Sequence, residues 1–272
     1  MINYKFSAIT AIAIITLILC SSYSYSDDSF IADHGSNVSP AKTTDISMVE
    51  EEVIIKVEDY VDNKIAVFPL RKAHVKCTFL FQNTSDKLIK ATVGFPGNVI
   101  NEPKYSDPIT NFVTVIEGRK YRINVKRETL KRKNKNTDEC CETYRNWYVW
   151  DMTFPPNSTV KVENSYLHYL SAPSGYEPFY LNYELSTGAN WKGPIGKASI
   201  KVIYNNAADL DKRVCDIKPK GWIRKQNQII WNFENIKPTL ADNIIISESN
   251  IGYDYPGMKH RPLLFKSNAP NQ

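Results

Sequence analysis

Long apolar runs are absent from this chain of 272 residues. The longest apolar run, Ala8–Cys20, has 13 residues, whereas a membrane-spanning helix needs about 18 to 20. The run follows one cation, Lys5, and precedes a stretch of small residues that includes Ser24 and Ser26, which is the layout of a secretory signal peptide. We therefore expect residues 1–26 to be a signal peptide, and the mature chain to be periplasmic or secreted, with no membrane span.

Cys20 ends this apolar run and offers an alternative to simple cleavage, namely a lipid anchor on its thiol. Leu19, the residue before it, is bulky, whereas lipoprotein signals favour a small residue at that place. We therefore expect cleavage after Ser26, with lipidation at Cys20 as the alternative.

Cysteine is scarce in the rest of the chain, with four residues after the expected cleavage site. Compartments outside the cytoplasm, which receive exported proteins, usually oxidise accessible thiol pairs. Cys77 alternates with apolar residues on one strand face, which favours a buried free thiol. The candidates for a disulfide are Cys140 or Cys141 with Cys215, and the sequence leaves the pairing open.

Catalytic and metal-binding signatures are also missing. The chain has no G-x-S-x-G nucleophile elbow, no H-E-x-x-H pair, no phosphate loop and no C-x-x-C motif. The four histidines, His34, His74, His168 and His260, are too far apart in sequence to pre-form a metal site on one helix or strand. We expect no cofactor, no metal and no catalysis; the alternative is a hydrolase or metal-dependent enzyme whose site is assembled from distant residues.

A strong net charge of either sign is absent. The formal net charge is +5, and removal of Lys5 with the signal peptide lowers it to +4, which is too small to indicate a polyanionic partner. Because the chain is also expected to be exported, nucleic acid is not an expected partner. The dense basic cluster between Lys126 and Lys135 is interpreted as a charged, solvated loop.

Helical periodicity is rare, and period-two alternation takes its place. Apolar residues alternate with polar ones at 75–81, 121–125 and 148–154, and further strands are expected at 160–170, 197–204, 228–234 and 243–248. Turn signals separate these segments. The sequence predicts an all-β fold, an antiparallel β-sandwich with minor helix, and one helical turn near 138–146.

We expect three parts after this reading. The signal peptide is followed by an all-β sandwich region at 27–255 and by an irregular C-terminal tail at 256–272. The least regular internal stretch is 126–142. It is interpreted either as a long hairpin loop or as a boundary near 128–144 between two subdomains.

Aromatic residues are plentiful, and rings that face outward on a sandwich can bind sugars. The candidate binding residues are Trp147, Tyr169 and Trp191. Core packing and strand propensity explain most of the other rings without a ligand. The expected function is binding or assembly with an envelope protein or a glycan as the partner, and a glycan-binding module is a further alternative.

The glycine-rich stretch at 185–202 reads LSTGANWKGPIGKASIKV. A phosphate cradle places its glycines between a strand and a helix, but the alternation after Pro194 predicts a strand. Gly188, Gly193 and Gly196 then supply turn and bulge conformations, and Trp191 is predicted to be buried.

Four stretches, 27–55, 77–98, 148–166 and 185–202, each contain part of one longer sequence pattern. The positions that carry it are Asp28, Gly35, Ile46, Met48, Glu51, Phe81, Asn83, Val93, Phe95, Pro96, Trp150, Phe154, Pro155, Val162, Tyr166, Thr187, Gly188, Trp191, Gly193, Pro194 and Ile195. In these positions the chain resembles an exported bacterial protein family known as domain of unknown function 4424. The similarity spans about 28–248 and departs at Glu50, at Gly97 and in the cysteine-bearing basic loop. It implies export and no particular reaction.

Overall fold

The computed structural model describes residues 29–34, 37–40, 45–60, 70–100, 109–133, 140–170 and 179–248. The expected signal peptide at 1–26, the alternative lipid anchor at Cys20 and the expected tail at 256–272 lie outside these residues. Within the described ranges, none of the helices has the length and apolar composition that a membrane crossing requires.

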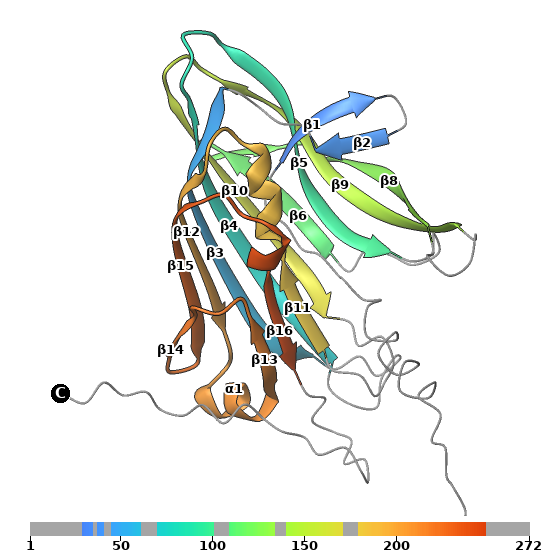
Figure 1. The fold of residues 1–272 in the computed structure, drawn as a ribbon, viewed down its shortest axis with the longest axis vertical. Coiled ribbons are helices and arrows are strands. Elements are labelled where there is room, and N and C mark those ends of the chain that lie inside the picture. Colours follow the sequence, from blue (N-terminus) through green and yellow to red (C-terminus); the bar gives the residue numbers. More distant parts are fainter. Residues whose placement is uncertain are drawn as a thin grey trace, which may run out of the picture.

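The fold is all-β, with three sheets and little helix (Figure 1). The eight-stranded sheet contains, in spatial order, β14 (Ile223–Lys225), β15 (Gln228–Ile236), β12 (Ile195–Ile203), β3 (Ile46–Tyr60), β4 (Leu70–Asn83), β10 (Thr159–Leu170), β6 (Ile109–Ile116) and β7 (Arg119–Tyr121). The five-stranded sheet contains β2 (Asn37–Pro40), β1 (Ser29–His34), β5 (Ile89–Ile100), β9 (Cys140–Phe154) and β8 (Asn124–Lys133). The three-stranded sheet contains β11 (Phe179–Tyr183), β16 (Ile244–Glu248) and β13 (Val214–Lys218).

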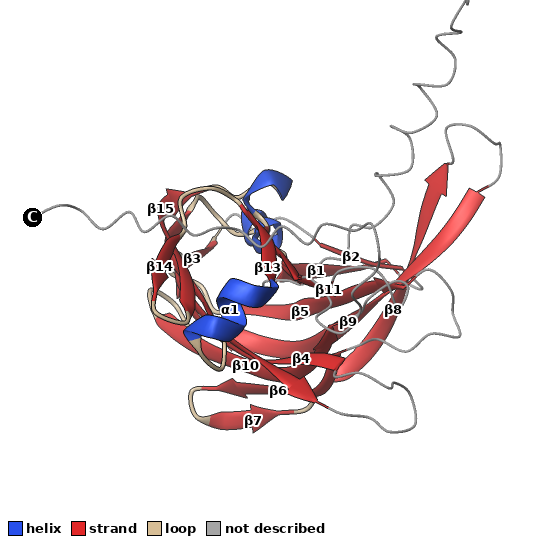
Figure 2. Ribbon diagram, turned by 90° about the horizontal axis from the view of Figure 1, so that it is seen from below, coloured by secondary structure: helices blue, strands red, loops and turns tan. Residues whose placement is uncertain are grey.

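The sheets pack their apolar faces around one core. Alternate residues of β4 and β10 are buried, as the period-two pattern predicts, and the core includes Val53 of the eight-stranded sheet, Trp150 of the five-stranded sheet and Ile246 of the three-stranded sheet. Figure 2 shows from below that the strands surround this interior, with the short helix α1 (Ala207–Arg213) at the near end. The predicted sandwich-like all-β fold with minor helix is therefore confirmed.

The described parts of the stretch 126–142, residues 126–133 and 140–142, are strand, so the prediction of a helical turn near 138–146 is wrong. Residues Asn124–Lys133 form β8, which pairs with β9 in antiparallel register. β8 is an edge strand, and charged residues are typical of edges because they discourage pairing with another chain. This charge hides the alternation that reveals the inner strands.

The helix α1 lies instead after β12. The side chain of Asn206 accepts a hydrogen bond of 2.8 Å from the backbone N–H of Asp209, which caps the helix. Two short 3₁₀ helices, η1 (Leu185–Asn190) and η2 (Leu240–Asp242), complete the helical content of the described residues.

One strand pair departs from the antiparallel pattern, because β12 pairs with β3 in parallel. Near the start of this pair the register of β3 against β4 shifts between Met48 and Glu50, which is a β-bulge. A Cβ on Gly196 of β12 would lie 2.6 Å from the carbonyl oxygen of Val49, the bulged residue. Gly196 thus permits the close approach of β12, and the bulge changes which residues of β3 face inward: Glu51 is buried.

Candidate functional site

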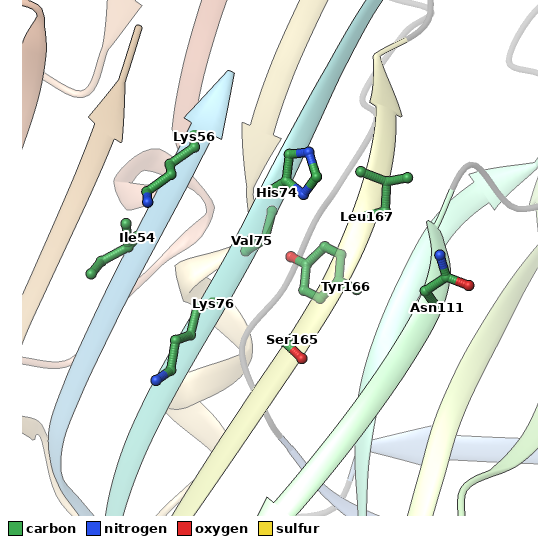
Figure 3. Close-up of a pocket in the computed structure, with 9 residues that line it drawn as sticks. All are labelled: Ile54, Lys56, His74, Val75, Lys76, Asn111, Ser165, Tyr166 and Leu167. Carbon is green, nitrogen blue, oxygen red and sulfur yellow. The ribbon is translucent and has the colours of Figure 1, made fainter. Parts of the chain in front are cut away.

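A hollow of about 440 Å³ lies on the outer face of the eight-stranded sheet, over β3, β4, β10 and β6 (Figure 3). Its volume lies within the range of roughly 300–1,000 Å³ that is usual for small-molecule sites. The residues that line it are Ile54, Lys56, His74, Val75, Lys76, Asn111, Ser165, Tyr166 and Leu167.

The strand register arranges the outward side chains of this face in two adjacent rows. The first row contains, from β12 to β10, Lys201, Ile54, Lys76 and Ser165. The second row contains, in the same order, Ile203, Lys56, His74 and Leu167. These two rows carry three lysines and a histidine, here called the basic band, and no carboxylate. Apolar side chains at Ile54, Ile203 and Leu167 are interleaved with them and are half-buried.

Carboxylates stand at the two ends of the basic band and hold some of its cations. Glu58 accepts hydrogen bonds from Lys72 at 2.9 Å and lies 3.0 Å from Nε2 of His74, and these contacts, led by that with Lys72, lower its pKa. At the other end, Glu163 lies 3.1 Å from Nζ of Lys76, and this contact lowers the pKa of Glu163.

The other two lysines of the band, Lys56 and Lys201, form no ion pair with any residue of the described part of the chain. Lys56 is exposed, and Lys201 is half-buried beside Ile54. The band therefore has uncompensated positive charge on β3 and β12, between the two terminal carboxylates Glu58 and Glu163.

A second β-bulge forms the wall of the hollow on the β6 side. The register of β10 against β6 shifts between Ser165 and Leu167, and Asn111 of β6 has a φ of 56° at this place. Asparagine adopts this left-handed conformation more readily than most residues. The side chain of Asn111 consequently borders the hollow opposite Leu167 (Figure 3).

A smaller hollow of about 370 Å³ adjoins the first one, and Lys76 lines both. Its other lining residues are Glu50, Glu52, Thr78, Leu80, Lys161 and Glu163. Two carboxylates of this set, Glu50 and Glu52, form no ion pair with described residues, so the positive centre of the face is followed by a more acidic end.

The hollow contains a histidine that is paired with a carboxylate and a serine, but they do not form a nucleophilic site. Nε2 of His74 is occupied by Glu58, and among the described residues no hydrogen bond joins His74 to Ser165. They stand in different rows on neighbouring strands, as a diagonal pair. A serine needs a base within hydrogen-bond reach to be activated. The arrangement is suited to binding charge and apolar surface.

Among the four histidines of the chain, His168 lies on the opposite face of the sheet from His74. It is buried, with Nε2 3.3 Å from Nδ2 of Asn98. Burial lowers its pKa to about 3, so its imidazole is neutral. Within the described ranges there is no group of three or more histidine, cysteine, aspartate or glutamate residues that could hold a metal ion.

Two of the three candidate binding rings are buried. Trp191 is only 2% exposed, which confirms its predicted burial, and its ring centroid is 4.4 Å from that of Phe81. Trp147 is fully buried, and its Nε1 donates a hydrogen bond of 2.8 Å to Glu128. Neither ring presents a free face to a ligand. The sequence could not predict this, because the alternation of a strand does not tell which of its faces is covered.

Tyr169, the third candidate, is half-buried on the outer face of β10. Its ring meets that of Tyr60 edge to face, with centroids 5.2 Å apart and an angle of 69° between the planes. The pair does not offer the coplanar platform that sugar stacking needs. Tyr169 stands next to Leu167 among the outward residues of β10, and so lies near the hollow without lining it.

Cys215 has a free thiol, which donates a hydrogen bond of 3.4 Å to the carbonyl of Arg213. The disulfide predicted from Cys140 or Cys141 to Cys215 is therefore not formed in the structure. Cys140 and Cys141 begin β9 in the five-stranded sheet, whereas Cys215 belongs to β13 in the three-stranded sheet. Cys77 is buried and forms no disulfide, as its alternation predicts.

The fold resembles the crystal structure of a Legionella pneumophila protein that carries the provisional name of a nutrient binding protein. The TM-score is 0.60 and the identity 19%, over 82% of this chain and 70% of that chain. An M1 zinc metallopeptidase from Deinococcus radiodurans matches with a TM-score of 0.34 and 9% identity, over 76% of this chain and 43% of that one, and this similarity is too low to indicate a shared fold. No family model and no curated protein matches the chain. The comparison with the Legionella protein thus supports the fold alone.

The residues that line the hollow were not predicted as site residues. The signal for them is present, since Lys56, His74 and Lys76 occupy outward positions of alternating segments. The sequence does not tell that these segments are neighbours, or that Lys201 approaches from a parallel strand.

Proposed function

We propose that this chain is an exported protein that binds a small ligand in the hollow on the outer face of its eight-stranded sheet, and that it does not transform the ligand. The observation that carries this proposal is the hollow itself, where apolar side chains share one surface with Lys56, which has no ion pair among the described residues. Lys201 does not line the hollow but stands beside Ile54, one of its lining residues. The provisional name of the Legionella protein, which has a similar fold, is compatible with binding.

The expected location, periplasmic or secreted, and the family, domain of unknown function 4424, are parts of the same proposal. Several positions of the resemblance support a shared framework. Ile46 and Met48 are fully buried before the bulge of β3, Glu51 is buried after it, and the backbone N–H of Lys192, next to Trp191, donates a hydrogen bond of 2.8 Å to the carbonyl of Ile46.

The test is a ligand screen with the chain from residue 27 onward. Thermal denaturation is measured with a panel of small neutral, cationic and anionic metabolites, and calorimetry gives the affinity of each compound that raises the melting temperature. The variant Ser165→Trp places a bulky side chain in the hollow, because Ser165 is exposed there. Thr129→Trp is the matched control, on an exposed position of β8.

We expect at least one compound to bind, with an affinity that falls about tenfold or more in Ser165→Trp and stays unchanged in Thr129→Trp. The proposal would be refuted if no compound binds, or if the affinity of every binder is the same in Ser165→Trp as in the wild type. The same preparation is incubated with esters, peptides and glycosides. Turnover that disappears in His74→Ala would replace binding by hydrolysis as the function, since His74 and Glu58 are already paired.

A further inference from the structure

We infer that the ligand of this hollow is a small organic anion, with a carboxylate or phosphate group held by the basic band and an apolar body held by the side chains between the lysines. This inference rests on the proposed function, because it names the chemical class of the ligand for the same site.

The first step is the placement of like charges. Lys56 is opposite His74 on β4, and its diagonal neighbours in the register are Lys76 on β4 and Lys201 on β12. In an antiparallel pair, directly opposite Cβ atoms are about 5 Å apart and diagonal ones about 7–8 Å, which long side chains still reach across. The ammonium groups of Lys56 and Lys201 therefore repel each other, and an anion between them would be attracted by both.

The second step is that no carboxylate of the described residues forms an ion pair that would neutralise the positive charge of Lys56 or Lys201. The carboxylate of Glu58 is occupied by Lys72 and His74, and that of Glu163 by Lys76 and Lys161, so neither is free to neutralise the centre of the band. Glu52 is the nearest carboxylate without an ion pair among the described residues. It belongs to the next row of the register, and it would repel an anion from that end toward Lys56.

The third step is the apolar surface between the charges. Ile54 stands between Lys201 and Lys76 in one row, and Ile203 is next to Lys56 in the other. Leu167 closes the second row on β10. Each of these apolar side chains is only partly buried, so part of its surface is available to a ligand. Burying apolar area adds about 25 cal/mol per Å², which an inorganic ion cannot contribute.

The fourth step is discrimination between ligand classes. A cation would meet Lys56 and Lys201 without a counter-charge, and like charges in contact oppose binding. A neutral ligand would leave the repulsion within the band unchanged. An anion with an apolar body is the class that gains from both kinds of side chain. Lysine ammonium groups are point charges with rotatable donors, so they bind a carboxylate and a phosphate group alike.

The experiment compares four probes with the same six-carbon chain, hexanoate, hexyl phosphate, hexanol and hexylamine, and a fifth without an apolar body, inorganic phosphate. Affinities are measured by calorimetry with the wild-type chain, with the double variant Lys56→Ala/Lys201→Ala, and with Lys197→Ala. Lys197 is the matched control because it is an exposed lysine of the same strand β12, outside the basic band. All three lysines lie on the outer face, so these changes leave the core intact; circular dichroism verifies the fold.

We expect hexanoate or hexyl phosphate to bind, and hexanol, hexylamine and inorganic phosphate to bind about tenfold more weakly or not at all. The double variant should lose about tenfold in affinity for the anions, since each removed ammonium group takes away one charged contact. The affinities of Lys197→Ala should stay within about twofold of those of the wild type. Rising salt should weaken the binding of the anionic probes only. Whichever of the two anions binds more tightly identifies the head group.

Two different failures can be told apart. If hexanol binds as tightly as hexanoate, or if the double variant keeps its affinity for the anions, the anionic class is wrong; loss of hexanol binding in Ser165→Trp would then keep the proposed binding function. If no compound of the screen binds in a manner sensitive to Ser165→Trp, the proposed function fails, and the inference fails with it.

Discussion

The hydroxyl of Tyr183 donates a hydrogen bond of 2.8 Å to Oε1 of Glu51. This bond joins β11 of the three-stranded sheet to β3 of the eight-stranded sheet across the interior. The second oxygen of the carboxyl group, Oε2, is buried and has no hydrogen-bond partner among the described residues. Burial raises the pKa of Glu51 to about 8, and the bond from Tyr183 only partly opposes this, so the carboxyl group is protonated at neutral pH.

The first prediction follows from this pKa. Because the unfolded chain loses the proton near pH 4.5 and the folded chain retains it up to about pH 8, Glu51 makes the free energy of unfolding fall as pH rises between these values. The fall attributable to Glu51 is on the order of 3–5 kcal/mol. Urea denaturation at pH 5, 6, 7 and 8 measures it.

The variant Glu51→Gln should remove this slope and be more stable than the wild type at pH 8, because an amide has no proton to lose there. Glu52→Gln, at the exposed neighbouring position, should keep the slope. Equal slopes in Glu51→Gln and the wild type would show that another group causes the pH dependence.

The second prediction concerns the contact between Gly196 and Val49. In Gly196→Ala the new methyl group would lie 2.6 Å from a backbone oxygen, so β12 must move away from β3. We expect the free energy of unfolding to fall by about 1–3 kcal/mol, as is usual for overpacking. Ser199→Ala on the same strand is the control and should change it by no more than about 0.5 kcal/mol. Chemical denaturation decides, and a neutral effect of Gly196→Ala would contradict the close approach.

The third prediction concerns Arg71, a fully buried arginine at the start of β4. Its Nε donates to Glu248 at 2.8 Å and its Nη1 donates to Asp59 at 2.9 Å. Burial opposes the charge of Arg71, but Glu248 and the other carboxylates outweigh it and raise the pKa above its ordinary value. Arg71→Met would leave Glu248 buried without its cation, at a cost of about 3–5 kcal/mol.

Lys72→Met is the control for Arg71, since Lys72 is the next residue and pairs with Glu58 at the surface. A surface pair contributes about 0–1 kcal/mol. Denaturation curves at neutral pH compare the two variants. Similar losses in both would mean that Arg71 does not anchor β16, the strand that contains Glu248.

The fourth prediction concerns thiol reactivity. Cys215 is half-buried with a free thiol and Cys77 is fully buried, so iodoacetamide should modify Cys215 in the folded protein and Cys77 only after unfolding. Peptide mass spectrometry of the treated protein gives both extents of modification. A Cys215 that resists alkylation until a reductant is added would indicate a disulfide after all.

Alternation was sufficient to predict the inner strands. β4 and β10 have neighbours on both sides and one face in the core, so a clean period of two appears in their sequences. The same rule missed β8, where charge on an edge strand obscures the pattern. It also placed a helical turn at the start of β9, because Cys140 and Cys141 interrupt the alternation there.

The site was beyond the reach of the sequence for a different reason. Lys56 and Lys201 belong to strands that are far apart in the chain and pair in parallel, and local patterns do not reveal such a pair. The bulge at Val49 depends on Gly196 of the neighbouring strand, so the inward orientation of Glu51 is also a tertiary effect. Burial of Trp147 likewise depends on what covers an outer face.

The parallel pair of β3 and β12 determines the order in which the chain can complete its fold. β3 has β4 on one side from early in the sequence, but its other side stays unpaired until the segment from Lys197 to Ile203 has been synthesised and has arrived. Until then a long strand exposes free backbone N–H and C=O groups, and such an edge can recruit a strand of another molecule. A chain shortened before Ile195 would keep that edge open permanently, so aggregation is the expected fate of truncated products.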